Sequence, residues 1–459
     1  MGARNKTPLR ETSTQRGQAF LIVVVILVIG SVAAIYTLIP SSRPSIEADK
    51  KTAEALAQAR DALIGHAVSH SSRPGALPCP DTTNDGTGES PTASPGGNSC
   101  PSYIGRLPWK SLGLPDLRDS SGERLWYLLS PNFRNANPPA GPVLNSDTLG
   151  QISITGHSNQ IIAVIISAGS ALASQDRDPL DNAKLNNPDN FLEGGNQTSG
   201  TSFTLTAGNG INDLFMPITH ETLLPKVEIR VAQDIKRLLQ NYYDLPSNTA
   251  PSYRNYYPFA APLTGTTACV EGVYRGRIPT SPCSPLNSLA ATLPPWFGPT
   301  GTGNRWNEII IYSVSPRCTP RLNTVPDLAA TPLYYLFNPP SGLFCQAITI
   351  FGIPLLQCYP YTQVVDSTST SCQNNSAGPM LTVNGSPAEA ILLTAGRGLT
   401  GQTRPCSRIA ACLEDQENHD GPAGYPANVN VDGSDNFIYV NPQRSAANND
   451  TIFIVRPSP

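Results

Sequence analysis

The stretch AVIISAGSAL at residues 163–172 returns as AILLTAGRGL at residues 390–399. Each copy is a short apolar run that ends at Gly, a pattern typical of a central strand bounded by a turn. Three further pairs of strings are found, and all four pairs occur in the same order along the chain: YIGRLP at 103–108 with YRGRIP at 274–279, DNFL at 189–192 with DNFI at 435–438, and INDLFM at 211–216 with NNDTIFIV at 448–455. Four matches in one order indicate an internal duplication.

An amphipathic helix precedes each set of strands. Apolar residues recur at spacings of three, four and seven from Ala53 to Ala67, and again from Val227 to Tyr242. We predict an α+β fold with two modules, residues 41–220 and 221–459, each an amphipathic helix packed on an antiparallel sheet. Because each copy has its own helix and strands, we expect each to bury a separate core, with a protease-accessible linker near residues 216–224.

The composition favours strands and loops and excludes one class of partner. Charged residues make up only 14% of the 459 residues, while 45 Pro and 37 Gly supply many turn-forming positions. The formal net charge of -3 provides no basic surface for nucleic acid. Nucleic acid is therefore not expected as a partner.

The ten cysteines include no CxxC pair, which favours disulfides formed in an oxidising compartment over zinc or redox sites. Only two of them, Cys79 and Cys100, lie in the first module, so their pairing is fixed if both are oxidised. The other eight allow 105 pairings. Order along the chain suggests Cys269 with Cys283, Cys318 with Cys345, Cys358 with Cys372 and Cys406 with Cys412. Metal binding by thiolates stays open as an alternative.

The N-terminus predicts a membrane helix. Residues 19–39 carry no charge and are long enough to cross a bilayer, and the leader before them is basic. We therefore expect a cytoplasmic leader at 1–17 and a transmembrane helix at 18–40. The predicted location is the bacterial inner membrane, single-pass, with the modules periplasmic or in a surface filament.

The junction between leader and apolar stretch reads QRG and then QAFLIVVV, with Gly17 directly before Gln18. It resembles the cleavage junction of type IV prepilins and type II secretion pseudopilins. The resemblance implies that a prepilin peptidase cuts after Gly17 and methylates Gln18, and Pro40 stands near the helix-kinking proline of many pilins. Ile22 departs from the family, because most pilins have Glu there; this argues against a major subunit. An uncleaved signal anchor is the alternative.

Two acidic turns are candidate calcium sites. The first is DTTNDGTGE, whose oxygen-bearing residues resemble a calcium loop without matching the EF-hand pattern. The candidate ligands are Asp81, Asp85 and Glu89 in the first module and Asp415, Glu417 and Asp420 in the second. Pseudopilins sometimes use calcium in such loops, whereas a solvated turn needs no ion. We expect no other cofactor.

The sequence carries no familiar catalytic motif: it lacks a GxSxG elbow, a Walker A loop, HExxH and a strand-linked GxGxxG. We therefore expect that the protein is not an enzyme. The resemblance implies a minor or tip structural protein of a type IV pilus or type II secretion filament, with the inner membrane, other pilin or pseudopilin subunits and prepilin peptidase as partners. The alternative is a signal-anchored periplasmic binding protein or adhesin independent of any filament. An envelope hydrolase has no motif to support it.

Overall fold

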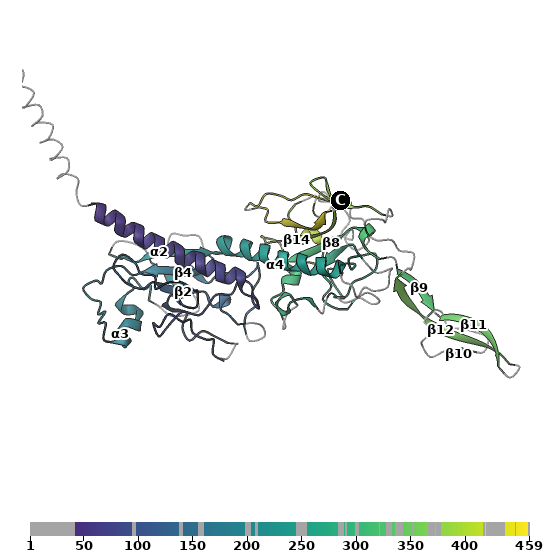
Figure 1. Cartoon of the computed structure of the whole chain (residues 1–459), viewed down its shortest axis with the longest axis horizontal. Coiled ribbons are helices and arrows are strands. Elements are labelled where there is room, and N and C mark those ends of the chain that lie inside the picture. The colour runs from purple at the N-terminus through teal and green to yellow at the C-terminus, as the bar shows by residue number, and fades with distance from the viewer. Residues whose placement is uncertain are drawn as a thin grey trace, which may run out of the picture.

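The fold consists of two α/β repeats in tandem and a β-sheet that extends from the second (Figure 1). The computed structural model describes residues 42–457 apart from several internal segments. These segments are 94–97, 137–140, 155–159, 198–202, 207–209, 245–254, 283–288, 290–291, 299–302, 321, 327–332, 336–342, 351–352, 366–371, 373–377, 416–417, 419–436 and 446.

The first repeat begins with a long helix and continues into a six-stranded sheet. Its elements are α2 (Ser42–Ser69), β1 (Ile104–Arg106), β2 (Trp126–Leu129), β3 (Ile152–Ile154), β4 (Ile161–Ser167), α3 (Asn182–Asn186), β5 (Phe203–Leu205) and β6 (Leu214–Thr219). The strand order is β1-β2-β4-β3-β5, and β6 also pairs with β4. All seven residues of β4 are buried, as expected for a central strand covered on both faces.

The second repeat reproduces this plan. Its elements are α4 (His220–Tyr243), β7 (Arg275–Arg277), β8 (Ile310–Val314), β13 (Leu381–Val383), β14 (Ser386–Thr394), β15 (Ile438–Tyr439) and β16 (Thr451–Pro457). The strand order is β7-β8-β14-β13-β15, and β16 also pairs with β14. Strand for strand, this is the topology of the first sheet.

The register of the central strands is the same in both sheets. Tyr127 of β2 lies opposite Ile165 of β4, and Tyr312 of β8 lies opposite Leu392 of β14. Ile165 and Leu392 are each the third residue of their repeated string. The prediction that the two apolar runs form equivalent central strands is therefore confirmed.

The cores of the two repeats are not separate. Helix α2 packs on β4 and β6, and α4 packs on the equivalent strands β14 and β16. Helix α4 also contacts α2 and β6, so it reaches into both repeats (Figure 1). One apolar cluster consequently includes Leu63 of α2, Ile165, Ile235 of α4 and Leu392. The prediction of two separate cores is wrong, because a single helix supplies apolar side chains to both.

Residues 216–224 do not form the protease-accessible linker that was expected, because they belong to a strand and the helix that directly follows it. Strand β6 ends at Thr219 and α4 begins at His220, with Thr219 and Thr222 forming a capping box at the junction. Leu223 and Leu224 are fully buried in the shared core. The boundary between the repeats thus falls inside packed secondary structure.

The far face of each sheet is covered by loops. In the first repeat, Trp126, Val164 and Ile166 pack with Phe191 in a cluster distinct from the shared core. In the second repeat, the residues facing away from the helix pack with the segment that carries the Cys406–Cys412 disulfide. Each repeat therefore has three layers: helix, sheet and loops.

The predicted fold class needs correction in two respects. First, the sheets are mixed, because β3 pairs in parallel with β5 and β13 in parallel with β15. In each repeat a long connection follows the central strand before the short strand β5 or β15 is added, and parallel pairing requires such a long connection. The described chain is thus mixed α/β, with few helices, and not a helix on a purely antiparallel sheet.

The second correction concerns the membrane. Within the described residues, no helix combines the length and the apolar character needed to cross a bilayer. Helices α2 and α4 are long but amphipathic, and both carry several charged residues. The predictions of a transmembrane helix and of single-pass anchoring in the inner membrane are corrected accordingly. The segment on which they rested, residues 18–40, lies outside the described residues.

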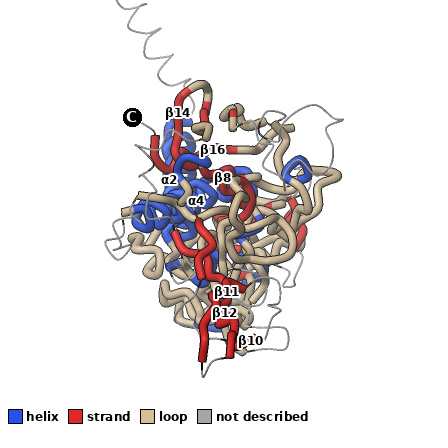
Figure 2. The backbone as a smooth tube through the Cα atoms, turned by 90° about the vertical axis from the view of Figure 1, so that its right-hand side faces the viewer, coloured by secondary structure: helices blue, strands red, loops and turns tan. Residues whose placement is uncertain are grey.

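An additional sheet, here called the arm, is inserted in the second repeat between β8 and β13. Its strands are β9 (Leu322–Pro326), β10 (Leu333–Tyr335), β11 (Leu343–Ile350) and β12 (Ile353–Val365). All pairings are antiparallel: β12 pairs with β11, β10 and β9. The arm extends away from both repeats (Figure 1), and in the perpendicular view its tip stands clear at the lower edge of the molecule (Figure 2). The first repeat has no counterpart to it in its described residues.

Candidate functional site

Several of the residues singled out from the sequence cannot be placed. Five lie outside the described residues, and their roles stay predictions: Gly17, Gln18, Cys283, Glu417 and Asp420. Cys269, the predicted partner of Cys283, is disulfide-bonded. Two predicted disulfides, Cys79–Cys100 and Cys406–Cys412, are confirmed.

Two other predicted pairings are wrong. The structure joins Cys345 to Cys358 and Cys318 to Cys372, instead of Cys318 to Cys345 and Cys358 to Cys372. The cause is the hairpin of β11 and β12, whose register sets Cys345 directly opposite Cys358. The described cysteines are all oxidised, so none offers a thiolate.

The first candidate calcium loop uses its carboxylates to fold the chain. Both oxygens of the buried Asp81 accept backbone N–H groups of the loop, the closest from Gly86 at 2.6 Å. Glu89 Oε1 accepts from the hydroxyl of Thr82 at 2.7 Å, and Asp85 is tied to the backbone two residues on. Within the described residues these three acids do not form a group of converging ligand atoms. In this structure the carboxylates of the loop therefore serve its own backbone and hydroxyl groups, and calcium binding there stays a prediction.

One group with converging ligand atoms does exist, formed by Cys318, Cys372 and Glu389. Its two sulfurs are joined in a disulfide, so they cannot act as thiolate ligands. Glu389 is buried, which raises the pKa of its carboxyl, and its Oε2 accepts from Tyr257 at 3.4 Å. We read this group as part of the core.

The loop that follows each central strand has the same side-chain contacts in both repeats. Gln175 Nε2 donates to Glu193 at 2.6 Å, and Gln402 Nε2 donates to Glu414 at 2.7 Å. In both loops the glutamine Oε1 accepts from the backbone N–H three residues earlier. The two loops can therefore be compared residue by residue.

Each loop also encloses a buried aspartate. Asp213 Oδ2 accepts from the backbone of Glu193 at 3.1 Å, and Asp450 Oδ2 accepts from the backbone of Glu414 at 2.9 Å. Burial raises the pKa of Asp213 to about 6, and burial next to the Glu414 carboxylate raises the pKa of Asp450 well above its usual range. In both, Oδ1 is buried without a hydrogen-bond partner. A buried aspartate with a raised pKa, held by the backbone of a glutamate, is thus present in both repeats.

The loops differ at one equivalent arginine, two residues after each glutamine. In the first repeat, Arg177 Nε donates to Asn190 O at 2.9 Å and Nη1 donates to Gly169 O at 2.8 Å. In the second, Arg404 Nη2 donates to Ala395 O at 2.9 Å, but Nε and Nη1 have no hydrogen-bond partner. The Arg404 side chain is only 7% exposed. A structural arginine of the first repeat thus has unsatisfied donors in the second.

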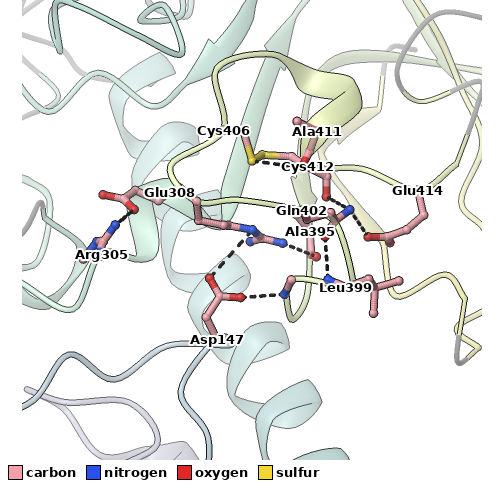
Figure 3. Close-up of a disulfide and its surroundings, with 12 residues drawn as sticks. Asp147, Arg305, Glu308, Ala395, Leu399, Gln402, Cys406, Ala411, Cys412 and Glu414 are labelled. Atoms are coloured by element: carbon pink, nitrogen blue, oxygen red, sulfur yellow. Dashed lines mark hydrogen bonds and ion pairs between the residues drawn. A yellow bond between two sulfur atoms is a disulfide. The ribbon is translucent and has the colours of Figure 1, made fainter. Parts of the chain in front are cut away.

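Arg404 faces the first repeat across a cavity of about 530 Å³. Figure 3 shows Asp147 of the first repeat pointing at the loop that carries Gln402, beside the Cys406–Cys412 disulfide. Asp147 Oδ1 accepts from Gly398 N–H at 2.7 Å, while its Oδ2 lies 3.9 Å from Arg404 Nε, beyond hydrogen-bond distance. The cavity is therefore polar and is built by both repeats.

Hydrogen bonds between the repeats fix the walls of this cavity. Asn304 Oδ1 accepts from Leu144 N–H at 3.0 Å, and Asn145 Nδ2 donates to Asn304 O at 2.9 Å. The side chain of Arg397 donates to Gln160 Oε1. These contacts bury Asn304 completely, so the cavity is part of a tight interface.

The arm presents apolar side chains without charge. From Leu328 to Val365 the sequence contains no Asp, Glu, Lys or Arg. On its described strands, Tyr334 is 55% exposed and Ile353 is 52% exposed, and Phe344 is also exposed. Exposed apolar side chains gathered on one extension mark an interaction surface more often than a solvated face. Their concentration in an uncharged stretch was the available sequence signal for this surface.

Comparisons of this chain with models of protein families, with curated proteins and with solved structures found no match.

Proposed function

We propose that this protein is a non-catalytic structural subunit of a type IV pilus or type II secretion filament, in a minor or tip position. The observation that carries the proposal is the arm: an uncharged, apolar β-sheet that stands away from the repeats and exposes side chains such as Ile353. Its natural occupant is another subunit of the same filament, since exposed apolar area is removed from water on assembly.

The geometry of the arm suits docking by strand pairing. Strands β10 and β11 lie at the two ends of the order β10-β12-β11. An outer strand can pair through its backbone with an extended segment of a neighbour. The Cys345–Cys358 disulfide joins two directly opposed residues and holds the hairpin in one register. A preformed arm has less conformational entropy to lose when it docks.

The prepilin-like junction and the tandem repeats agree with this role. Two head-forming repeats make a subunit too bulky for every position of a regular lattice, which favours a low copy number. The oxidised cysteines are typical of a protein that folds in an oxidising compartment. None of these features requires a substrate.

The first test is N-terminal processing. In cells that process other prepilins, the purified protein should begin at Gln18 with a methylated N-terminus, and Gly17→Glu should leave the full-length precursor. Gly2→Glu is the matched control and should be processed normally. Mass spectrometry of the N-terminal peptide reads both. An intact Met1 or Gly2 terminus in the wild type would remove the filament proposal in favour of a binding protein or adhesin that acts alone.

The second test addresses the arm. Ile353→Asp places a charge on its exposed surface and should abolish co-purification with filament subunits, without changing the melting temperature. Leu180→Asp is the matched control, because Leu180 is 94% exposed in a loop of the first repeat. Equal recovery of the two variants in filaments would show that the arm is not the docking surface.

A further inference from the structure

The cavity between the repeats is large enough for a small molecule and carries an excess of positive charge. Its volume of about 530 Å³ lies within the range of ordinary ligand pockets. Three arginines line it, Arg305, Arg397 and Arg404, against two acids, Asp147 and Glu308. The balance therefore favours an anion.

The contacts within the cavity leave one arginine without a full set of partners. Arg305 is paired with Glu308 at 2.5 Å, and Asp147 is hydrogen-bonded to the backbone of Gly398. Arg404 has one hydrogen bond, to a carbonyl, and its ion pair with Asp147 is loose, at 3.9 Å, so that two buried nitrogens lack a hydrogen-bond acceptor. A buried guanidinium with unsatisfied donors is costly unless something supplies the missing oxygens.

The first repeat shows what a purely structural arginine looks like at this position. Arg177 has acceptors for all three of its nitrogens, including Gln175 Oε1 at 2.5 Å, and it stands 3.5 Å from Glu123. The second repeat keeps the arginine but not these acceptors. Its donors are instead turned to a space that opens only because two repeats are packed together.

We propose that this cavity binds a small molecule carrying a carboxylate, whose oxygens accept hydrogen bonds from Nε and Nη1 of Arg404, with Arg397 as the second cation. Arginine presents several fixed donors and keeps its charge when buried, which suits it to carboxylates. An acidic sugar and a free acidic amino acid offer the same group, and both fit the volume. The proposal does not depend on assembly into a filament.

Calorimetry on the full chain tests the proposal with four probes: glucuronate, glutamate, glucose and inorganic phosphate. Glucuronate or glutamate should bind with a dissociation constant in the micromolar to millimolar range, and glucose should not bind. Binding of glucuronate alone identifies an acidic sugar as the ligand class, and binding of glutamate alone identifies an amino acid. Binding of phosphate without either carboxylate would overturn the proposal, as would no binding of any probe.

Variants locate the site. Arg404→Gln and Arg397→Gln should each weaken carboxylate binding at least tenfold, since each removes a charged donor. Arg408→Gln removes the same charge from an exposed position outside the cavity and should bind like the wild type. Arg397 is only partly buried, so its variant keeps the test valid even if Arg404→Gln is unstable. Unchanged binding in Arg397→Gln would overturn the assignment of the site.

Discussion

Replacing Asp213 with Asn is expected to make the protein more stable at neutral pH. The native carboxyl is buried, and its pKa is raised from an ordinary 3.8 to about 6. A raised pKa means that the folded state holds the proton more tightly than the unfolded state. The contribution of this group to stability is therefore complete below about pH 4 and is lost as the pH rises through about 6.

The magnitude follows from the shift. About two pKa units at about 1.4 kcal/mol each give about 3 kcal/mol lost between acidic and neutral pH. Asparagine has no proton to lose, and its carbonyl oxygen can accept the bonds that Asp213 Oδ2 accepts from Glu193 N–H and Asn196 Nδ2. Its amide can occupy the place of Oδ1, which has no partner now.

Urea unfolding at half-unit steps from pH 4 to pH 8 measures the effect. The wild type should lose stability relative to Asp213→Asn as the pH rises, and the two should differ by about 3 kcal/mol at pH 7. Asp450→Asn should behave in the same way over a window that extends to higher pH, because burial and Glu414 both raise the pKa of Asp450.

Asp85→Asn is the control with the opposite sign. Hydrogen bonds from Thr87 lower the pKa of the exposed Asp85, so its contribution is present at neutral pH and is lost on acidification. The reasoning fails if Asp213→Asn and the wild type keep a constant difference in unfolding free energy from pH 4 to pH 8. It also fails if the variant becomes the less stable of the two as the pH rises.

Two further predictions concern the ion pairs and the arm. Arg444→Met should lower the unfolding free energy by about 3 kcal/mol, because it leaves the buried carboxylate of Glu228 in α4, now 2.7 Å from Arg444, without its charged partner. Lys50→Met, at the exposed Lys50–Glu54 pair, should lower it by under about 1 kcal/mol. Equal losses for the two variants in chemical denaturation would contradict this reasoning. Replacing both Cys345 and Cys358 with Ser should lower the stability of the hairpin by about 3 kcal/mol on the chain-entropy account. Faster amide exchange confined to β11 and β12 is the expected signature, and unchanged protection there would argue against it.

The repeated sheet could be read from the sequence because its strands are short, apolar and bounded by Gly. The apolar runs 161–167 of β4 and 388–394 of β14 are buried throughout, so their signal does not depend on alternation. The helices were visible for the same kind of reason, through the periodic apolar face that packs on each sheet. What the pattern could not tell was that one helix serves both cores, since apolar residues show that a face is buried and not what it contacts.

The arm was missed for a physical reason. Strand β12 contains Pro354 and Pro360, and proline normally argues against a strand. The segment is also apolar on successive residues, so it lacks the alternation of a half-buried strand. Without the hairpin, the pairing of Cys345 with Cys358 could not be preferred over its rivals.

The cavity between the repeats could not be predicted from the sequence either. Arg177 and Arg404 each stand five residues after the end of a matching string, at 172 and 399, and nothing in those strings distinguishes the two arginines. The difference arises from neighbours far away in the chain: carbonyls of the same repeat surround Arg177, while Asp147 of the other repeat faces Arg404. Duplicated residues can thus acquire different roles through packing alone.

Helix α4 determines how the molecule should respond to a pulling force. Two domains joined by a slack tether yield one after the other, and each rupture leaves the next domain intact. Here a single helix is buried against α2 and β6 at one side and against β14 and β16 at the other. Tension applied across the repeats would have to strip that helix from both sheets. The molecule should therefore break in one large event, and carry load as a single rigid element up to that point.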